Sequence, residues 1–243
     1  MIFLFDVDGT LTPSRAKIDY QFSLFLSMFF LNNDCYLVTG SDRPKTIEQI
    51  GSLYDYCVKV FQCSGNEIWS GKELIRSSDW KMSEELRDYL LFRLDESRFL
   101  IKTGKHIEER SGSLNFSFVG RNCTREERQH YVKWDTETGQ RDLLQKDIEK
   151  HFPDLSAVVG GETGVDIFPK GKDKQQVLDF LPKDQEIAFF GDKIEPGGND
   201  YSIAMAIQNT NRGRYYQVSS WENTRDILES LPAKDNGQLV LDF

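Results

Sequence analysis

The order of apolar segments near the start of the chain is the feature that most constrains the fold. Residues 2–5 form an apolar run typical of a buried strand, residues 19–32 suit a core helix, and residues 34–38 suit a second buried strand. A strand, a helix and a strand in this order pair in parallel through a right-handed crossover. Further strands are expected at residues 58–61 and 186–190, so the sequence predicts an α/β domain with a parallel sheet.

The middle of the chain, roughly residues 98–168, has a different character. Short segments alternate apolar and polar residues, and Ser111-Gly112 between two of them is a hairpin signal. Thr124 and Glu127 form a capping box that predicts a helix, and a second helix is expected over residues 139–151. We therefore expect an α+β module inserted in the α/β domain. Its expected strands are residues 99–102, 106–108, 114–118, 155–159 and 165–168.

Domain boundaries are placed where these patterns change. The core domain is expected to comprise residues 1–78 and 172–243, and the inserted domain residues 79–171, with hinges near Ser78 and Gly171. The inserted domain begins with an amphipathic helix over residues 79–95. A short hairpin is expected over residues 67–73, and the core resumes with a helix around residues 173–181.

Composition excludes several classes of function. The 243 residues are 39% hydrophobic, which suffices for a core, and the net charge of −9 argues against nucleic acid or an anionic membrane as partner. The four cysteines show no Cys-x-x-Cys pair, so neither a zinc site nor a disulfide framework is indicated. The most apolar stretch, residues 20–31, is shorter than the roughly 20 residues that span a bilayer. With no basic, apolar leader at the start of the sequence, we expect a cytoplasmic protein.

Two aspartates follow the first strand. Asp6 and Asp8 point the same way by strand alternation, about 7 Å apart, and would repel each other without a cation such as Mg²⁺. If Asp6 attacks phosphorus it forms an acyl phosphate, and Asp8 is placed to supply and remove protons. A lone Asp-x-Asp also occurs as a plain metal-binding pair, a turn or a helix cap.

Polar residues also follow two other core strands. Thr39 and Ser41 precede a helix that contains Lys45, and hydroxyl and N–H groups at a helix start suit an anion, although a simple helix cap is the alternative. After the strand at 186–190 comes a glycine-rich loop whose candidate Mg²⁺ ligands are Asp192, Asn199 and Asp200. Lys174 offers the positive charge that phosphoryl transfer requires, although most such lysines are only solvated.

The run Phe-Asp-Val-Asp-Gly-Thr-Leu-Thr resembles the first signature of the haloacid dehalogenase superfamily, which transfers phosphoryl groups through a nucleophilic aspartate. Segments over most of the chain are similar to the eukaryotic-type phosphomannomutases, most specifically Pro-Gly-Gly-Asn-Asp at 196–200 and the arginine-containing run at 120–128. The other similar segments are residues 4–15, 40–51, 110–128, 160–174 and 189–201. The resemblance implies a Rossmann-like core with an inserted cap.

Residue by residue, the resemblance implies that Asp6 is the nucleophile, Asp8 the general acid/base and Asp192 a metal ligand. In the superfamily a Ser or Thr after the second strand holds the phosphoryl group, and a lysine in the region of Lys174 supplies charge. The residues that fall where the family binds sugar phosphate are Arg15, Arg110, Arg121, Arg128 and Asp166. A hexose 1,6-bisphosphate activator and a homodimer through the cap are also implied.

The sequence departs from the family pattern at several positions. Gly164 replaces a serine that helps to hold the substrate, and Lys172 stands where the family has tryptophan. Thr39 replaces a usual glycine, and Cys63-Ser64-Gly65 replaces the Pro-Glu-Asn or similar turn of the family. The position of Gly164 bears on which hexose is preferred and leaves the phosphoryl-transfer residues intact.

The sequence therefore predicts a mutase that interconverts mannose 6-phosphate and mannose 1-phosphate through a bisphosphorylated sugar. The alternative is a Mg²⁺-dependent sugar-phosphate phosphatase, since water can attack the same aspartyl phosphate. The three cap arginines favour the mutase, which must grip a second phosphate. A non-catalytic binding protein is disfavoured because Asp6, Asp8, Lys174 and Asp192 are all present.

Overall fold

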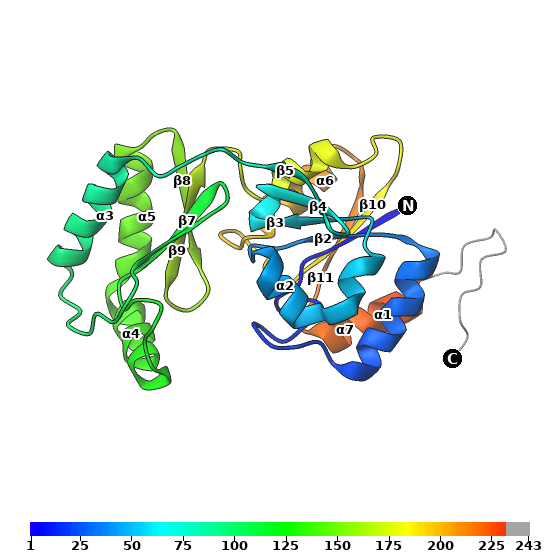
Figure 1. Cartoon of the computed structure of the whole chain (residues 1–243), viewed down its shortest axis with the longest axis horizontal. Helices are drawn as coiled ribbons and strands as arrows, with labels where there is room; N and C mark the ends of the chain where they lie inside the picture. Colours follow the sequence, from blue (N-terminus) through cyan, green and yellow to red (C-terminus); the bar gives the residue numbers. More distant parts are fainter. Residues whose placement is uncertain (232–243) are drawn as a thin grey trace. The chain divides into compact units, whose positions relative to one another are not determined.

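The computed structural model describes residues 1–231. The chain forms two compact units, one of residues 1–75 with those from 174 onward and one of residues 76–173 (Figure 1). We call them the core unit and the cap unit. The end of the segment that the sequence assigns to the core domain, residues 232–243, lies outside the described residues.

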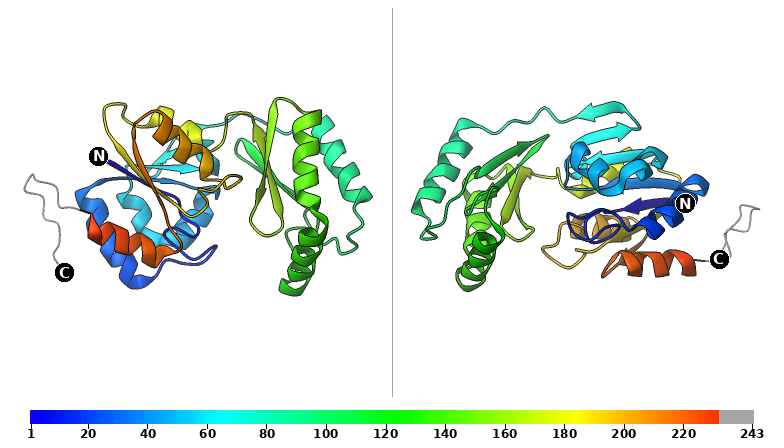
Figure 2. Two further views of the ribbon diagram at one scale, coloured as in Figure 1. Left: turned by 180° about the vertical axis from the view of Figure 1, so that it is seen from behind. Right: turned by 60° about the horizontal axis from the view of Figure 1, so that its bottom comes forward.

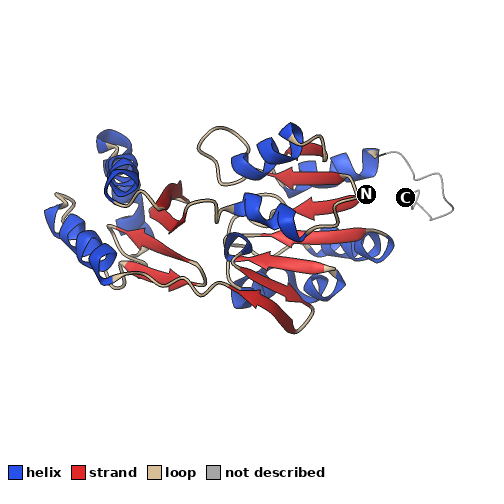
Figure 3. Cartoon of the chain, turned by 90° about the horizontal axis from the view of Figure 1, so that it is seen from above, coloured by secondary structure: helices blue, strands red, loops and turns tan. Residues whose placement is uncertain are grey.

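The core unit is built on a seven-stranded sheet. Its strands are β1 Ile2–Phe5, β2 Asp34–Val38, β3 Lys59–Gln62, β4 Glu67–Ser70, β5 Glu73–Ser77, β10 Ile187–Gly191 and β11 Gly213–Gln217. They lie side by side in one sheet, whose strands are red in Figure 3, in the order β11-β10-β1-β2-β3-β4-β5. Strands β11, β10, β1, β2 and β3 are parallel, and β4 pairs antiparallel with β3. Phe5 pairs with Leu37 on one side and Phe190 on the other, so the strands around β1 end at one edge.

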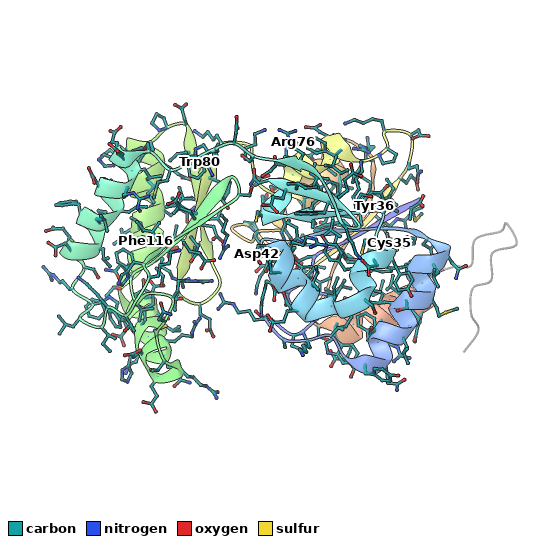
Figure 4. All side chains as sticks on the ribbon, in the orientation of Figure 1. Cys35, Tyr36, Asp42, Arg76, Trp80 and Phe116 are labelled. Carbon is teal, nitrogen blue, oxygen red and sulfur yellow. The ribbon has the colours of Figure 1, made fainter. Side chains whose placement is uncertain are left out.

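Helices cover both faces of this sheet (Figure 2). One hydrophobic cluster packs α1 Tyr20–Asn32, α2 Arg43–Ile50, the 3₁₀ turn η1 Gly51–Tyr56 and α7 Trp221–Ser230 against one face. The other cluster packs α6 Tyr201–Asn209 and the 3₁₀ helix η3 Lys174–Phe180 against the opposite face. Alternation along the strands feeds both clusters, since Cys35 of β2 belongs to the first and Tyr36 to the second (Figure 4). The predicted α/β class is confirmed.

The cap unit is a four-stranded antiparallel sheet with three helices. Its strands are β6 Ile107–Arg110, β7 Ser113–Ser117, β8 Leu155–Gly160 and β9 Gly164–Pro169, in the order β6-β7-β9-β8. Its helices are α3 Glu84–Glu96, α4 Arg125–Thr138 and α5 Gln140–His151. Phe116 of β7 lies in the cluster that joins sheet and helices (Figure 4). The capping box at Thr124 and the hairpin at Ser111-Gly112 form as predicted.

Three predicted elements differ from those observed. Residues 99–102 form no strand; Phe99 packs on Tyr131 while Leu100 points to solvent at 90% exposure, so the segment fills the core without pairing. The first cap helix begins at Glu84 because Ser83 caps it, and Trp80 and Met82 pack from an irregular segment. The helix expected at 173–181 is the 3₁₀ helix η3.

The apolar helix α1 is a core helix, as predicted. Asp19 caps its start by accepting from the backbone N–H groups of Gln21 and Phe22. Within residues 1–231, no helix is both long enough and apolar enough to cross a bilayer.

Candidate active site

Three carboxylates from distant parts of the chain meet at the carboxyl edge of the core sheet. Asp6 follows β1, Asp192 follows β10 and Asp200 precedes α6. Each offers an oxygen that lies within 4.8 Å of those of the other two. The parallel pairing of β1 with β10 produces this meeting, because the Asp6 backbone N–H donates to the Phe190 carbonyl at 2.9 Å.

Lys174 forms ion pairs with two of these three acids. Its Nζ donates to Asp6 Oδ1 and to Asp200 Oδ1, both at 2.6 Å, and its side chain is 1% exposed. One ammonium against three carboxylates leaves a net charge of −2 when all are ionised. Buried charge of this size requires compensation, and hard carboxylate oxygens are the ligands that Mg²⁺ prefers. The donor set of Asp6, Asp192 and Asp200 therefore fits a Mg²⁺ ion.

Burial and charge shift the pKa values of Asp6, Asp192 and Lys174. Burial raises the pKa of Asp6, and the opposing contact with Lys174 does not overcome it. Burial, reinforced by the Asp200 charge, raises the pKa of Asp192 to about 6. Burial alone would lower the pKa of Lys174, but Asp200 and Asp6 outweigh it and the net shift is upward. Lys174 thus stays charged. A cation bound near Asp6 and Asp192 would favour their charged forms and so lower their raised pKa values.

Glycine permits the close approach of the two loops that carry these acids. Gly9 has φ of +83°, a conformation that favours glycine, and a Cβ there would overlap Asp192 Oδ2. The glycine of the Asp-x-Asp-Gly run is therefore needed for its backbone conformation and for the space that Asp192 occupies.

The side chain of Asp8 lies outside the three-carboxylate group. Its Oδ1 accepts from the backbone N–H of Arg15 at 2.5 Å and from Gln49 Nε2 at 2.9 Å. Asn199 is exposed in the loop before Asp200. Metal ligation by Asp8 and Asn199 stays a prediction.

The polar residues after β2 lie at the same edge of the sheet. Thr39 is buried, and its Oγ1 accepts from the backbone N–H of Ser41 at 3.1 Å. Asp42 caps α2 by accepting from the Lys45 N–H (Figure 4). The Lys45 ammonium pairs with Glu48 at 3.1 Å. Part of this segment therefore acts as a helix cap, the simpler of the two sequence interpretations.

The cap unit brings two of its predicted phosphate-binding arginines to one acid, Glu108. Glu108 accepts from Arg110 Nε at 3.0 Å and from Arg121 Nε at 2.5 Å. Arg110 Nη1 also lies 3.5 Å from Asp166 Oδ1. Burial would raise the pKa of Glu108, but Arg110 and Arg121 outweigh it and the net shift is downward. Arg128 stands apart on α4 and pairs with Glu162 at 3.4 Å.

Comparison with known proteins decides the family. The eukaryotic phosphomannomutase family profile matches residues 29–233. A phosphomannomutase from Oryza sativa subsp. indica is 35% identical over 243 residues, covering 95% of each chain. The chain belongs to the eukaryotic phosphomannomutase family.

Two solved structures that resemble this phosphomannomutase-family chain are more distant in sequence than the Oryza sativa relative. The C-terminal domain of a C. albicans trehalose-6-phosphate phosphatase superposes with a TM-score of 0.61 at 17% identity, covering 90% of this chain and 79% of that one. A haloacid dehalogenase-like hydrolase from Bacteroides thetaiotaomicron gives 0.57 at 14% identity, covering 84% and 85%. These likenesses confirm the haloacid dehalogenase fold.

The departure from the phosphomannomutase family at Gly164 has a steric explanation. A Cβ at this position would come within 2.5 Å of Asn115 Nδ2. Asn115 is held there because its Nδ2 donates to Asp166 Oδ1 at 2.7 Å. In this chain the amide of Asn115 occupies the space that a larger residue at 164 would need.

Sequence reasoning did not single out Gln49, Glu108 or Asn115. Glu108 lies two residues before Arg110 on one strand, hence on the same face, and this spacing was a usable signal. Asn115 pairs with Asp166 only through the β7–β9 register, which no local pattern predicts. Gln49 contacts Asp8 across 41 positions of the chain.

Proposed function

We propose that this chain interconverts mannose 6-phosphate and mannose 1-phosphate through an aspartyl-phosphate enzyme and a bisphosphorylated hexose. The observation that carries the proposal is the buried Asp6, which pairs with Lys174 and lies near two further carboxylates, in a chain of the eukaryotic phosphomannomutase family. The relative from Oryza sativa that bears this name matches along nearly the whole chain.

In the proposed reaction an Asp6 carboxylate oxygen attacks one phosphorus of the bisphosphate. The bond from phosphorus to the sugar oxygen breaks, and that oxygen takes a proton from Asp8. In the second half, a hydroxyl of the monophosphate gives its proton to Asp8 as its oxygen attacks the aspartyl phosphate. Lys174 stabilises the charge on the transferring group from within hydrogen-bond distance of Asp6. Mg²⁺, when bound, would neutralise negative charge on the phosphoryl oxygens.

Substrate grip is proposed to involve two sets of residues. Arg15, Thr39, Ser41 and Lys45 would bind the phosphate that reacts. Arg110, Arg121, Arg128 and Asp166 would bind the rest of the sugar phosphate. Arg110 and Arg121 are supported in this role by Glu108, which holds both guanidinium groups. Because arginine forms bidentate, permanently charged contacts, it suits a distal phosphate.

Four further features are proposed from the family resemblance. A hexose 1,6-bisphosphate would act as activator by phosphorylating Asp6. The cap would be hinged near Ser78 and Gly171. Two chains would associate through their caps, a state that sedimentation equilibrium measures. A cytoplasmic location is the fourth of these features.

A phosphatase is the less favoured alternative. The solved trehalose-6-phosphate phosphatase shares the fold at 17% identity, whereas the phosphomannomutase from Oryza sativa is 35% identical. The deciding experiment is a phosphorus NMR time course with mannose 1-phosphate and a catalytic amount of glucose 1,6-bisphosphate. We expect mannose 6-phosphate as the main product. Inorganic phosphate as the main product, formed at a rate independent of the bisphosphate, would overturn the proposal in favour of hydrolysis.

A further inference from the structure

Gln49 is a buried residue of α2 whose side chain reaches the loop that carries Asp8. It is 1% exposed. Its Nε2 lies 2.9 Å from Asp8 Oδ1, 3.3 Å from Thr12 Oγ1 and 3.5 Å from the Ala16 carbonyl oxygen. One amide group therefore joins helix α2 to both ends of the segment that leaves the Asp-x-Asp motif.

The chemistry of its neighbours fixes which way the amide points. A carboxylate and a backbone carbonyl can only accept hydrogen bonds, so the NH₂ end must face Asp8 and Ala16. The opposite end, Oε1, is buried with no hydrogen-bond partner among residues 1–231. A buried acceptor without a partner lowers the stability of the fold. This orientation of the Gln49 amide nevertheless places its NH₂ group against Asp8.

The contact also differentiates the two oxygens of Asp8. Oδ1 receives two donors, the Gln49 amide and the Arg15 backbone N–H at 2.5 Å. Together these donors set both the position of Oδ1 and the plane of the carboxyl group. Oδ2 is then the oxygen that remains to contact a reacting group.

We propose that Gln49 is a positioning residue for Asp8: it turns Oδ1 toward α2 and so presents Oδ2 to the sugar oxygen for proton transfer. This inference rests on the proposed function. Misplacing a reacting group by about 1 Å can cost on the order of 10²-fold in rate, so a lost positioning contact has a measurable kinetic effect.

The test separates positioning of a proton donor from general support of the fold. Phosphorylation of Asp6 by glucose 1,6-bisphosphate expels a sugar alkoxide, which needs a proton from Asp8. Phosphorylation by 4-nitrophenyl phosphate expels a stabilised phenolate, which does not. Rapid-quench measurement of monophosphate formation and the burst of 4-nitrophenolate each report this first step alone.

For Gln49→Leu we expect the sugar-phosphate step to slow by roughly 10- to 100-fold and the aryl-phosphate burst by less than about 3-fold. Gln49→Glu keeps the shape but removes the donor, and should show the same difference if the leucine variant folds poorly. Equal slowing with both substrates, or no slowing with either, would overturn the inference.

Thr46→Val is the matched control. Thr46 is on the same helix, is fully buried, and donates to Gln62 Oε1 at 2.8 Å with no contact to Asp8. It should change the two rates by the same small factor. Failure of the proposed function is a separate result, because it would be seen as absence of wild-type interconversion in the NMR experiment, whatever Gln49 does.

Discussion

At the scale of single residues, the site depends on how charge is balanced around Lys174. Its ammonium contacts Asp6 and Asp200, while Asp192 lies near both carboxylates and forms no ion pair with a lysine or arginine of residues 1–231. Burial and the charge of Asp200 raise the pKa of Asp192 to about 6.

Asp192 should make the metal-free protein less stable as pH rises. The pKa of Asp192 in the folded protein lies above the ordinary value of 3.8, so the folded state binds the proton more tightly than the unfolded state. Proton binding therefore stabilises the fold at low pH, and this contribution is lost as the pH rises from about 4 to about 6. Melting temperatures in a chelator at pH 5 and pH 8 should therefore differ less in Asp192→Asn than in the wild type. Added Mg²⁺ should raise the wild-type melting temperature at pH 8 more than that of the variant. An equal response of the two proteins to pH and to Mg²⁺ would contradict this assignment.

Gly164 supports a second residue-scale prediction. Gly164→Ser should destabilise the protein by about 1–3 kcal/mol, because the new Cβ meets the amide of Asn115. Asn115→Ala in the same chain should relieve the overlap, so urea unfolding of the double variant should reveal a favourable coupling energy. Additive losses in the double-mutant cycle would show that Asn115 is not the obstacle.

At the scale of secondary structure, α1 has an unusual surface for a helix that lies on the outside of a sheet. Its 13 residues include no charged side chain. Leu26 is fully buried against the sheet, whereas Leu24 is 48% exposed and Leu31 is 61% exposed. The same apolar residue type thus occupies two very different environments on one helix.

Leucine-to-alanine substitutions should distinguish these environments. Leu26→Ala should cost about 2–5 kcal/mol because it leaves a cavity. Leu24→Ala should stay within about 0.5 kcal/mol of wild type, as most exposed substitutions do. Urea denaturation of both variants measures the difference, and similar losses would mean that the exposed face is covered in solution.

How far the sequence predicts these elements depends on whether their signals are local. The sequence predicts strand β2 because its signal is one continuous apolar run. It predicts the start of helix α4 because the two residues of the capping box, Thr124 and Glu127, are only three positions apart. The segment at 99–102 was wrongly predicted as a strand, because apolar alternation does not reveal whether a pairing partner exists. The meeting of Asp6 with Asp192 follows from the parallel register, whereas the Gln49 contact with Asp8 depends on side-chain packing that only the structure provides.

At the scale of the whole molecule, the two units divide the proposed work. The core unit carries the buried acids and Lys174, and the cap unit carries the arginines. A mutase requires both, because the sugar must be held by one phosphate while the other reacts. Removing a cap arginine should therefore affect bisphosphorylated substrates more than substrates with one phosphate.

Arg128→Ala should lower kcat/KM for interconversion by roughly 10- to 150-fold, since a charge-assisted contact contributes about 1.5–3 kcal/mol. Hydrolysis of an aryl phosphate, which has no second phosphate, should change far less. Arg87→Ala is the control, because Arg87 pairs with Glu109 at 3.0 Å on the exposed surface of the cap unit. Equal loss of both activities in Arg128→Ala would contradict its role at a distal phosphate.

The central claim is that Asp6 carries the phosphoryl group and passes it to a sugar. The most direct measurement is a chase experiment: the protein is labelled with radioactive glucose 1,6-bisphosphate, separated from sugar, and mixed with unlabelled mannose 1-phosphate. We expect label on Asp6 by tandem mass spectrometry, none in Asp6→Asn, and transfer of the label to a hexose bisphosphate. Label that never reaches Asp6, or that passes to inorganic phosphate instead of the hexose, would contradict the account.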